Sequence, residues 1–421
     1  CWPDERSEHS ERSRETNMRI SSAQLYQNSL TAMLDNQSTL SRTQLQLSTG
    51  RRILTPADDP AGSATVLDLN QAIESTHQYQ RNADSARGRL ELEESTLGSV
   101  GDILQRVREL TLQANNDTQS SDTRRYIAFE LRERRKQLID LANLRDASGE
   151  YLFAGSRGSV QPFQVAASGQ VAYAGDQSSR NLQIGPSQQI ADGDAGSDVF
   201  VGIRNGNGTF TTLDNPANSG SGVIDPGAVS GTYVADTYTI SFTQVLPTDP
   251  ITYSVTGAVS GVVVAAGTPY SSGAQINFNG VSVSVAGTPA DTDSFTVAPS
   301  ANQDLFTTVQ NLVTALESSA TTNAGQAQFH NAVNRGIVDL DQGMDNIIEI
   351  RARAGARLNT LDSQKGTNET FLLQAQQSLS EVQDLDYAEA ASRLNRQLLS
   401  LEAAQQTFTR VQGLSLFNFL R

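Results

Sequence analysis

Apolar residues recur every three or four positions near both ends of the chain, and this spacing predicts long amphipathic helices. In the N-terminal segment the spacing alternates between four and three over residues 26–47, with glutamine at two positions, Gln37 and Gln44. The same alternation returns near the C-terminus, over residues 391–408. Such a seam is typical of a coiled coil, in which two helices bury their apolar stripes against each other. We therefore expect the first and last helices to pair.

Further helical patterns lie inside these two segments. Residues 60–115 carry apolar positions at intervals of seven, and a helix of that length would be roughly 80 Å long at 1.5 Å per residue. The polar cluster NNDTQSSD, residues 115–122, predicts a break, after which Ser121 or Asp122 could cap a third helix. Beyond the middle of the chain, a helical run begins at Leu305 and another covers residues 329–361.

The middle of the chain, about residues 156–300, has a different composition. It holds most of the 32 glycines and contains short runs that alternate apolar and polar residues, such as TYTISFT (237–243) and QINFNGVSVSV (275–285). A period of two between turn residues is typical of antiparallel strands. The predicted fold class is therefore α+β, with a long antiparallel helical bundle or coiled coil formed by the N- and C-terminal regions and an inserted antiparallel β domain.

The patterns also suggest where the domains begin and end. Residues 1–17 are charged and polar, and we expect them to be an unstructured extension or tag, with Met18 as the natural start. The remaining chain is predicted to form a terminal coiled-coil domain (18–58 with 380–421), an inner helical bundle (59–155 with 301–379) and an outer β-rich domain (156–300).

Charge and composition exclude several classes of function. A net charge of -15 argues against nucleic-acid binding and against an anionic membrane surface, both of which favour a basic face. The single cysteine allows no disulfide within the chain, and the three histidines lie far apart in sequence. We predict no metal site and no cofactor. No apolar run reaches the length of a membrane span, and no Sec-type leader is visible.

The stretch LQLSTGRRILTPADDPAGSATVL, residues 45–67, raises the question of chemistry, because paired carboxylates beside arginines could catalyse or bind a metal or phosphate. We interpret it instead as a helix corner. Gly50 is suited to end one helix, and Asp59 followed by Pro60 is suited to begin the next. Arg51 or Arg52 could then neutralise Asp58 or Asp59. Asp192 and Asp194 are similarly interpreted as part of an acidic loop on the β domain and not as a calcium loop, because the bidentate glutamate of a calcium loop is missing.

The corner also carries a family resemblance. LSTGRRI (47–53) followed by ADDPAG (57–62) resembles the N-terminal region of the flagellin superfamily, and the run from DYAEAASRL (386–394) to Phe408 resembles its C-terminal helix. MRIS (18–21), YLFAGS (151–156), the segment 351–358 and the ending LSLFNFL (414–420) are more similar to the hook-associated branch of that superfamily. The alternative within the superfamily is a flagellin, the subunit of the filament itself.

The resemblance implies a structural protein and not an enzyme. It implies export through the flagellar type III apparatus, an extracellular location at the hook–filament junction, and an adapter role between hook and filament. The implied partners are further copies of the chain in a ring, the first hook-associated protein, flagellin, and a cytoplasmic export chaperone of the FlgN type; neither nucleic acid nor membrane insertion is implied. A rival from another class is a secreted β-domain lectin or enzyme carried on a helical stalk.

Because neither terminal helix can bury its stripe alone, we expect the seam to provide the assembly interface as well. Its predicted residues are Tyr26, Leu30, Met33, Leu40, Leu47, Leu394, Leu398, Leu401 and Phe408.

Overall fold

The computed structural model describes residues 22–246, 248–318 and 321–419, so the predicted extension 1–17 and the start at Met18 lie outside it. The described chain forms two compact units. One combines the segment up to Thr76 with the segment from Thr370 onward, and the other runs from His77 to Glu369. The finer division into terminal, inner and β-rich domains stays a prediction. Helices at both ends of the sequence and an antiparallel β region between them confirm the predicted α+β class.

Six α-helices account for most of the described chain: α1 Ser22–Thr49, α2 Pro60–Ala114, α3 Ser121–Ala142, α4 Leu305–Glu317, α5 Asn323–Gln383 and α6 Tyr387–Phe419. The strands lie between α3 and α4: β1 Phe163–Val165, β2 Val171–Tyr173, β3 Asn181–Gln183, β4 Gln189–Ala191, β5 Ile203–Arg204, β6 Phe210–Asp214, β7 Val223–Ile224, β8 Ala228–Val229, β9 Tyr238–Thr243, β10 Thr252–Gly257, β11 Gly261–Pro269, β12 Gln275–Phe278, β13 Val281–Ala286, β14 Ser294–Pro299 and β15 Asn302–Gln303. A short π-helix, Ser197–Val201, precedes β5.

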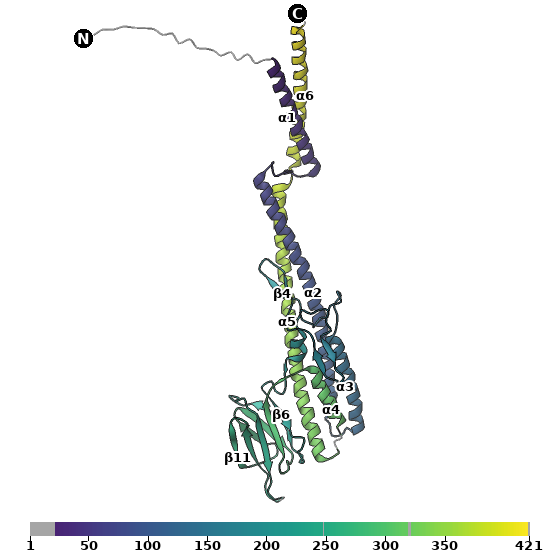
Figure 1. Cartoon of the computed structure of the whole chain (residues 1–421), viewed down its shortest axis with the longest axis vertical. Helices are drawn as coiled ribbons and strands as arrows, with labels where there is room; N and C mark the ends of the chain where they lie inside the picture. The colour runs from purple at the N-terminus through teal and green to yellow at the C-terminus, as the bar shows by residue number, and fades with distance from the viewer. Residues whose placement is uncertain (1–21, 247, 319–320, 420–421) are drawn as a thin grey trace, which may run out of the picture. The chain divides into compact units, whose positions relative to one another are not determined.

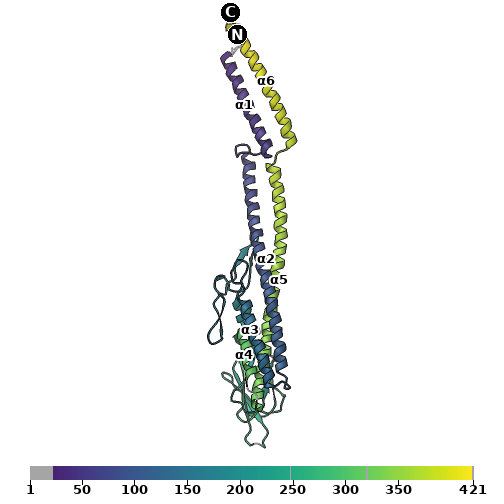
Figure 2. The same cartoon turned by 90° about the vertical axis from the view of Figure 1, so that its right-hand side faces the viewer.

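In the first unit, α1 and α6 lie side by side, as Figures 1 and 2 both show. The rings of Tyr26 and Phe408 meet across this pair with their centroids 5.1 Å apart. The beginning of α2 and the end of α5 belong to the same unit, where Ile73 packs in a small buried cluster with Leu372 and Ala375. The helical ends of the chain are thus paired, as the two seams predict.

The second unit is built on a helical core in which α3 and α4 run beside α2 and α5 (Figure 1). Apolar residues of all four helices are buried together, and the rings of Phe153, Phe163, Phe200 and Phe306 fill one side of this core with edge and stacked contacts. The cap of α3 is Ser120 rather than the predicted Ser121 or Asp122. Ser120 has extended backbone, and its hydroxyl accepts a hydrogen bond from the Thr123 amide at 3.2 Å.

Two glycines of α5 allow α4 to approach closely. A Cβ placed on Gly336 would lie 2.4 Å from Leu312 Cδ2, and one placed on Gly343 would lie 2.3 Å from Leu305 Cδ2. Both leucines are buried and cannot move aside without disturbing the core. Gly355 is also in α5, but a Cβ there would meet nothing within 4 Å.

These positions should respond in opposite ways to the same substitution. Gly336→Ala is expected to overpack the α4–α5 contact and to lower the free energy of unfolding by about 1–3 kcal/mol. Gly355→Ala is expected to raise it by about 0.5–1 kcal/mol, since alanine favours helix and no neighbour is displaced. Denaturant titration of both variants checks this, and equal effects would contradict the packing argument.

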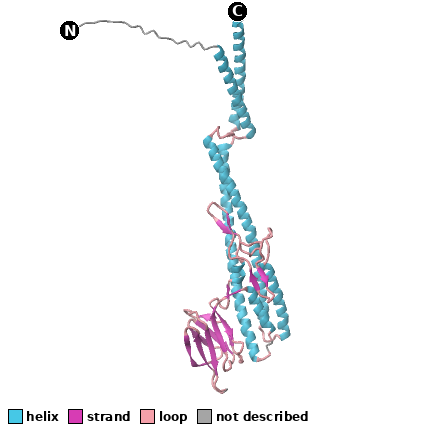
Figure 3. Cartoon of the chain, in the orientation of Figure 1, coloured by secondary structure: helices cyan, strands magenta, loops and turns pink. Residues whose placement is uncertain are grey.

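The second unit also contains a β sandwich of two antiparallel sheets (Figure 3). One sheet has the order β11-β10-β9-β14-β6, and the other has the order β12-β13-β7, with β8 also paired to β13. Strands β9, β13 and β14 alternate buried and less buried residues, and their buried side chains form one common core. The alternating run 275–285 is a hairpin rather than one strand: Asn279 and Gly280 both have positive φ, which is the requirement of a tight two-residue turn.

Polar contacts fix the sandwich to α5. The side-chain oxygen of Asn331 accepts a hydrogen bond from the backbone N–H of Ile224 at 2.8 Å. Its side-chain nitrogen donates to Gly222 O at 3.1 Å. The buried Asp339 accepts the Gly206 amide at 2.7 Å. The segments that lead into and out of the sandwich also pair with each other, as β5 with β15. The smaller hairpin β3–β4 lies instead on α2 and α5, where Ile184 and Ile190 are buried against helical residues including Leu90 and Leu361.

Candidate assembly site

The predicted interface residues of the terminal helices divide into covered and uncovered positions. Leu40 is buried, whereas Met33, Leu47, Leu394, Leu401 and Phe408 are half-buried between α1 and α6. Tyr26, Leu30 and Leu398 keep 42%, 40% and 39% of their surface exposed. Pairing therefore covers only part of the apolar stripe and leaves the remainder accessible, together with Leu34 and Leu399, which sequence reasoning did not single out.

The polar residues that face α6 lie one position before the glutamines predicted from the seam. Gln37 and Gln44 are exposed, while Asn36 and Thr43 turn inward. The reason is geometric, because a straight helix with 3.6 residues per turn drifts away from a strict heptad by about 20° per repeat. Gln46, one turn before the corner, is also buried, and its side-chain amide donates to Arg52 O at 2.6 Å.

The corner between α1 and α2 is tied to the junction between α5 and α6. Gly50 follows the last residue of α1 with φ +69°, and its carbonyl accepts the Leu385 amide at 2.9 Å. The Arg52 amide donates to Gln383 O at 2.7 Å, and Arg51 forms an isolated antiparallel bridge with Asp384. A side chain at position 50 would be strained by the positive φ and would lie 2.7 Å from the Tyr387 hydroxyl. Backbone hydrogen bonds therefore hold the α1–α2 corner against the α5–α6 junction.

The two aspartates of the corner bind backbone amides. Asp59 lies before Pro60, the first residue of α2, and its Oδ1 accepts the Gly62 amide at 2.8 Å, the geometry of an N-cap. Asp58 Oδ2 accepts the amides of Leu54 at 3.0 Å and Thr55 at 2.9 Å, which closes the loop before α2. These carboxylates organise the backbone rather than face a substrate.

Arginines neutralise both carboxylates. Arg52 pairs with Asp59 at 3.3 Å and also donates to Val382 O at 2.7 Å. Asp58 pairs instead with Arg42, on α1, which sequence reasoning missed. The sequence could have indicated this pair, since Arg42 lies only two turns before the end of α1. The pKa of Asp58 is lowered first by its hydrogen bond from the Thr55 amide and then by the Leu54 amide and Arg42. The pKa of Asp59 is lowered by the Gly62 amide and then by Arg52.

Acid should therefore loosen the corner. A carboxylate whose folded pKa is lowered stabilises the fold above its ordinary pKa of 3.8, and this contribution is lost as the pH falls through the lower folded value. We expect amide-exchange protection at Leu54, Thr55 and Gly62 to fall in that range. Asp58→Asn should reduce protection of Leu54 and Thr55 at neutral pH, with Asp68→Asn, an exposed position on α2, as the matched control. Unchanged protection in Asp58→Asn would contradict the assigned role.

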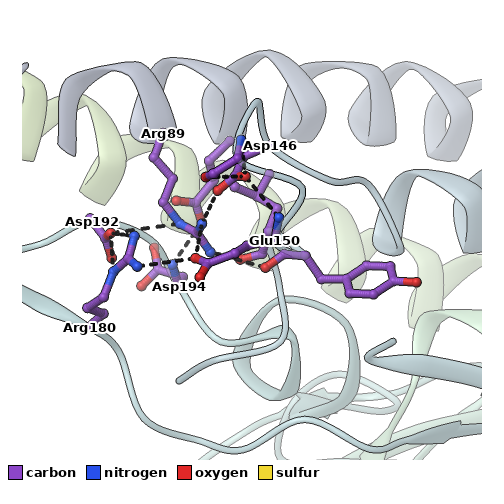
Figure 4. Close-up of polar contacts among 10 residues, drawn as sticks. Arg89, Asp146, Glu150, Arg180, Asp192 and Asp194 are labelled. Atoms are coloured by element: carbon purple, nitrogen blue, oxygen red, sulfur yellow. Dashed lines mark hydrogen bonds and ion pairs between the residues drawn. The ribbon is translucent and has the colours of Figure 1, made fainter. Parts of the chain in front are cut away.

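A second group of acids and arginines lies in the other unit, around Arg89 of α2 (Figure 4). Arg89 is buried and donates to Asp146 at 2.5 Å and to the carbonyls of Tyr151 and Leu152 at 3.1 Å each. Arg180 binds Asp192 through two nitrogens at 2.7 and 2.5 Å.

Asp194 completes this group and also forms a two-nitrogen ion pair, with Arg357 of α5 at 3.0 and 2.9 Å. Asp192 and Asp194 lie in a loop, and the arginines that pair with them bury both side chains. The void beside the cluster measures about 10 Å³, room for one water. The group anchors the loop before the π-helix Ser197–Val201 to α2 and α5.

Glu93 lies at the centre of this anchor and is fully buried. Its Oε1 accepts the Asp194 amide at 3.1 Å, but its Oε2 has no hydrogen-bond partner among the described residues. Burial, and then the nearby charge of Asp194, raise the pKa of Glu93 to about 8, although Arg357 and Arg89 partly oppose the increase. Glu93 is therefore a neutral acid in the folded protein at pH 7.

This burial makes the stability of the second unit depend on pH. Between the ordinary pKa of 4.5 and about 8, the folded chain holds a proton that the unfolded chain has lost, so stability falls as the pH rises, by at most about 1.4 kcal/mol per pH unit. Glu93→Gln should flatten this dependence in thermal unfolding between pH 5 and 9. Glu94→Gln, which changes the exposed neighbour paired with Arg351, should not. A Glu93→Gln profile that keeps the wild-type slope would disprove the assignment.

Paired terminal helices with an inserted β sandwich place the chain in a class of helical structural proteins, and its apolar seam is only partly covered. In agreement with this class, residues 20–157 match the family model described as the bacterial flagellin N-terminal helical region. None of the helices in the described ranges is long and apolar enough to cross a bilayer.

Two relatives match nearly their whole length. The chain is 25% identical to flagellar hook-associated protein 3 of Escherichia coli K12 over 400 residues, which cover 95% of this chain and 99% of that protein. It is also similar to the crystal structure of flagellar hook-associated protein 3 from Legionella pneumophila, with 31% identity, a TM-score of 0.72, and coverage of 75% of this chain and 98% of that one. By contrast, a phase 1 flagellin of Salmonella naestved is 33% identical over only 127 residues, a quarter of its length.

The chain belongs to the family of flagellar hook-associated protein 3, the flagellar junction protein FlgL. This confirms the resemblance to the flagellin superfamily and its hook-associated branch. The family is a structural one and not a family of enzymes, so the protein is a structural component of the flagellum.

Proposed function

We propose that the protein is an adapter that joins the hook to the flagellin filament at the hook–filament junction. The observation that carries this proposal is the terminal helix pair, whose apolar stripe is only partly covered within one chain. Apolar surface of this kind becomes buried when copies pack side by side. In this role the protein forms a ring of copies between the first hook-associated protein and the first flagellin subunits, outside the cell.

Full-length similarity supports an adapter over a filament subunit. The hook-associated relatives align over nearly their whole length, including the β region, whereas the flagellin relative aligns over a quarter of its own. An adapter and a filament subunit also differ in what their loss does. A strain lacking this chain should release flagellin into the medium as monomer, because flagellin is still made and exported but has no junction on which to polymerise.

Export and assembly both depend on the same helices in this proposal. The chain leaves through the flagellar type III apparatus. A cytoplasmic chaperone of the FlgN type covers the C-terminal helix until then, because an amphipathic helix with exposed Leu398 and Leu399 would otherwise associate prematurely. The terminal helices become fully ordered when neighbours cover them. Amide exchange on the monomer should therefore show weaker protection in α1 and α6 than in the helices of the second unit.

The decisive variant is Leu398→Asp with Leu401→Asp. Two charges on the α6 seam should abolish incorporation into flagella while leaving the β sandwich folded, because burying an unpaired carboxylate at an interface is costly. The control is Asn395→Asp with Gln406→Asp, which adds the same charge at exposed polar positions of α6. Export is measured as secreted protein and assembly as filament-bearing cells. Normal filaments on the Leu398→Asp, Leu401→Asp variant would overturn the proposal.

A further inference from the structure

Two buried polar atoms in the cluster around Arg89 lie beside the same glycine. Arg89 Nε and Glu93 Oε2 have no hydrogen-bond partner among the described residues, and both residues are at least nine-tenths buried. A Cβ placed on Gly193 would lie 3.5 Å from each of these two atoms. The two atoms therefore face one common space next to Gly193.

The two atoms do not satisfy each other. The ion pairs of Arg89 join it to Asp146, Glu150 and Asp192, and none of those found between described residues joins it to Glu93. Since each atom lies 3.5 Å from the same point, the two are no more than twice that distance apart. One small molecule with hydrogen bonds of about 2.9 Å can bridge a gap of this order. Because an unpaired buried polar atom is costly, the arrangement favours such a molecule.

Size and charge select water as that molecule. The void of about 10 Å³ beside the cluster is lined by Arg89 and Gly193 among others, and it has room for one water. The positive charge of Arg89 disfavours a cation, and the carboxylates of Asp192 and Asp194 disfavour an anion. Water is neutral and can donate or accept a hydrogen bond, so it suits Glu93 Oε2 whether or not that carboxyl group carries a proton.

Further acceptors lie within reach of the same space. The buried Asp192 has its Oδ2 at 3.9 Å from Arg89 Nε. The carbonyl oxygen of Leu152 lies 4.0 Å from the position that a Cβ on Gly193 would take. A water molecule that receives a hydrogen bond from Arg89 and contacts Glu93 can thus donate to one of these oxygens. That gives it the three or so polar partners that are typical of buried water.

We propose that Arg89, Glu93 and Gly193 form a binding site for one water molecule, which joins Arg89 Nε to Glu93 Oε2. The site lies in the second unit, and the inference does not depend on the adapter function. Gly193 is not among the glycines with positive φ, and a Cβ there would meet its neighbours at ordinary contact distances. Neither the backbone nor the packing therefore requires glycine at this position, whereas room for the water does.

Gly193→Ala and Gly193→Ser are a matched pair of variants, because both add the same Cβ and they differ by one hydroxyl group. Alanine displaces the water and leaves both atoms unpaired, whereas the serine hydroxyl can replace the hydrogen bonds of the water. We expect the midpoint of thermal unfolding of the second unit to fall by about 2–4 °C in Gly193→Ala, and by less in Gly193→Ser. A Gly193→Ala midpoint equal to or above that of Gly193→Ser would overturn the proposal.

A crystal structure of the full chain tests the site directly. At a resolution that shows ordered water, we expect density for one water molecule within hydrogen-bond distance of both Arg89 Nε and Glu93 Oε2. The Gly193→Ala variant should lack that density. A wild-type structure without it, or one in which the two side chains contact each other directly, would overturn the proposal. This measurement on the wild-type chain decides the question even if neither variant folds.

Discussion

An amphipathic helix alone in water cannot bury its apolar stripe, and most of the first unit follows from this constraint. Pairing α1 with α6 joins the two ends of a chain of 421 residues and brings the corner after α1 against the junction before α6. Backbone hydrogen bonds from Leu385 to Gly50 and from Arg52 to Gln383 then hold the two junctions together. Because the pair covers its own stripe only in part, the same constraint that forms the pair also provides surface for neighbours.

Polar groups perform different tasks in the two units. At the corner, Asp58 and Asp59 remain charged because backbone amides and arginines stabilise their carboxylates at the protein surface. Around Arg89, burial is deeper, and the central Glu93 is held as a neutral acid. Acid is thus expected to weaken the first unit, whereas the second unit is expected to lose stability as the pH rises from about 4.5 to about 8.

The sequence predicted features that depend on neighbouring residues in the chain. The start of α2 at Pro60 after the Asp59 cap follows from local hydrogen-bond chemistry, and the helical pairing follows from the spacing of apolar residues. Features that depend on tertiary contacts were not predictable. The burial of Glu93 requires the loop of Asp194, 101 residues away, to fold back over α2. Similarly, a drift of one position in the seam depends on how straight α1 remains. The turn at Asn279 and Gly280 was predictable in principle, since that dipeptide favours a tight hairpin.

The β sandwich is attached in a way that bears on how such proteins diversify. The chain enters and leaves it through one antiparallel pair, β5 with β15, and hydrogen bonds from Asn331 and Asp339 hold its inner edge on α5. Since the two connections lie side by side, the distance that an inserted module must span is fixed and short. Loops or whole strands beyond that pair can therefore change in length and sequence without altering the helices below. The outer surface of the sandwich is thus free to vary, while α5 keeps the contacts that hold the inner edge.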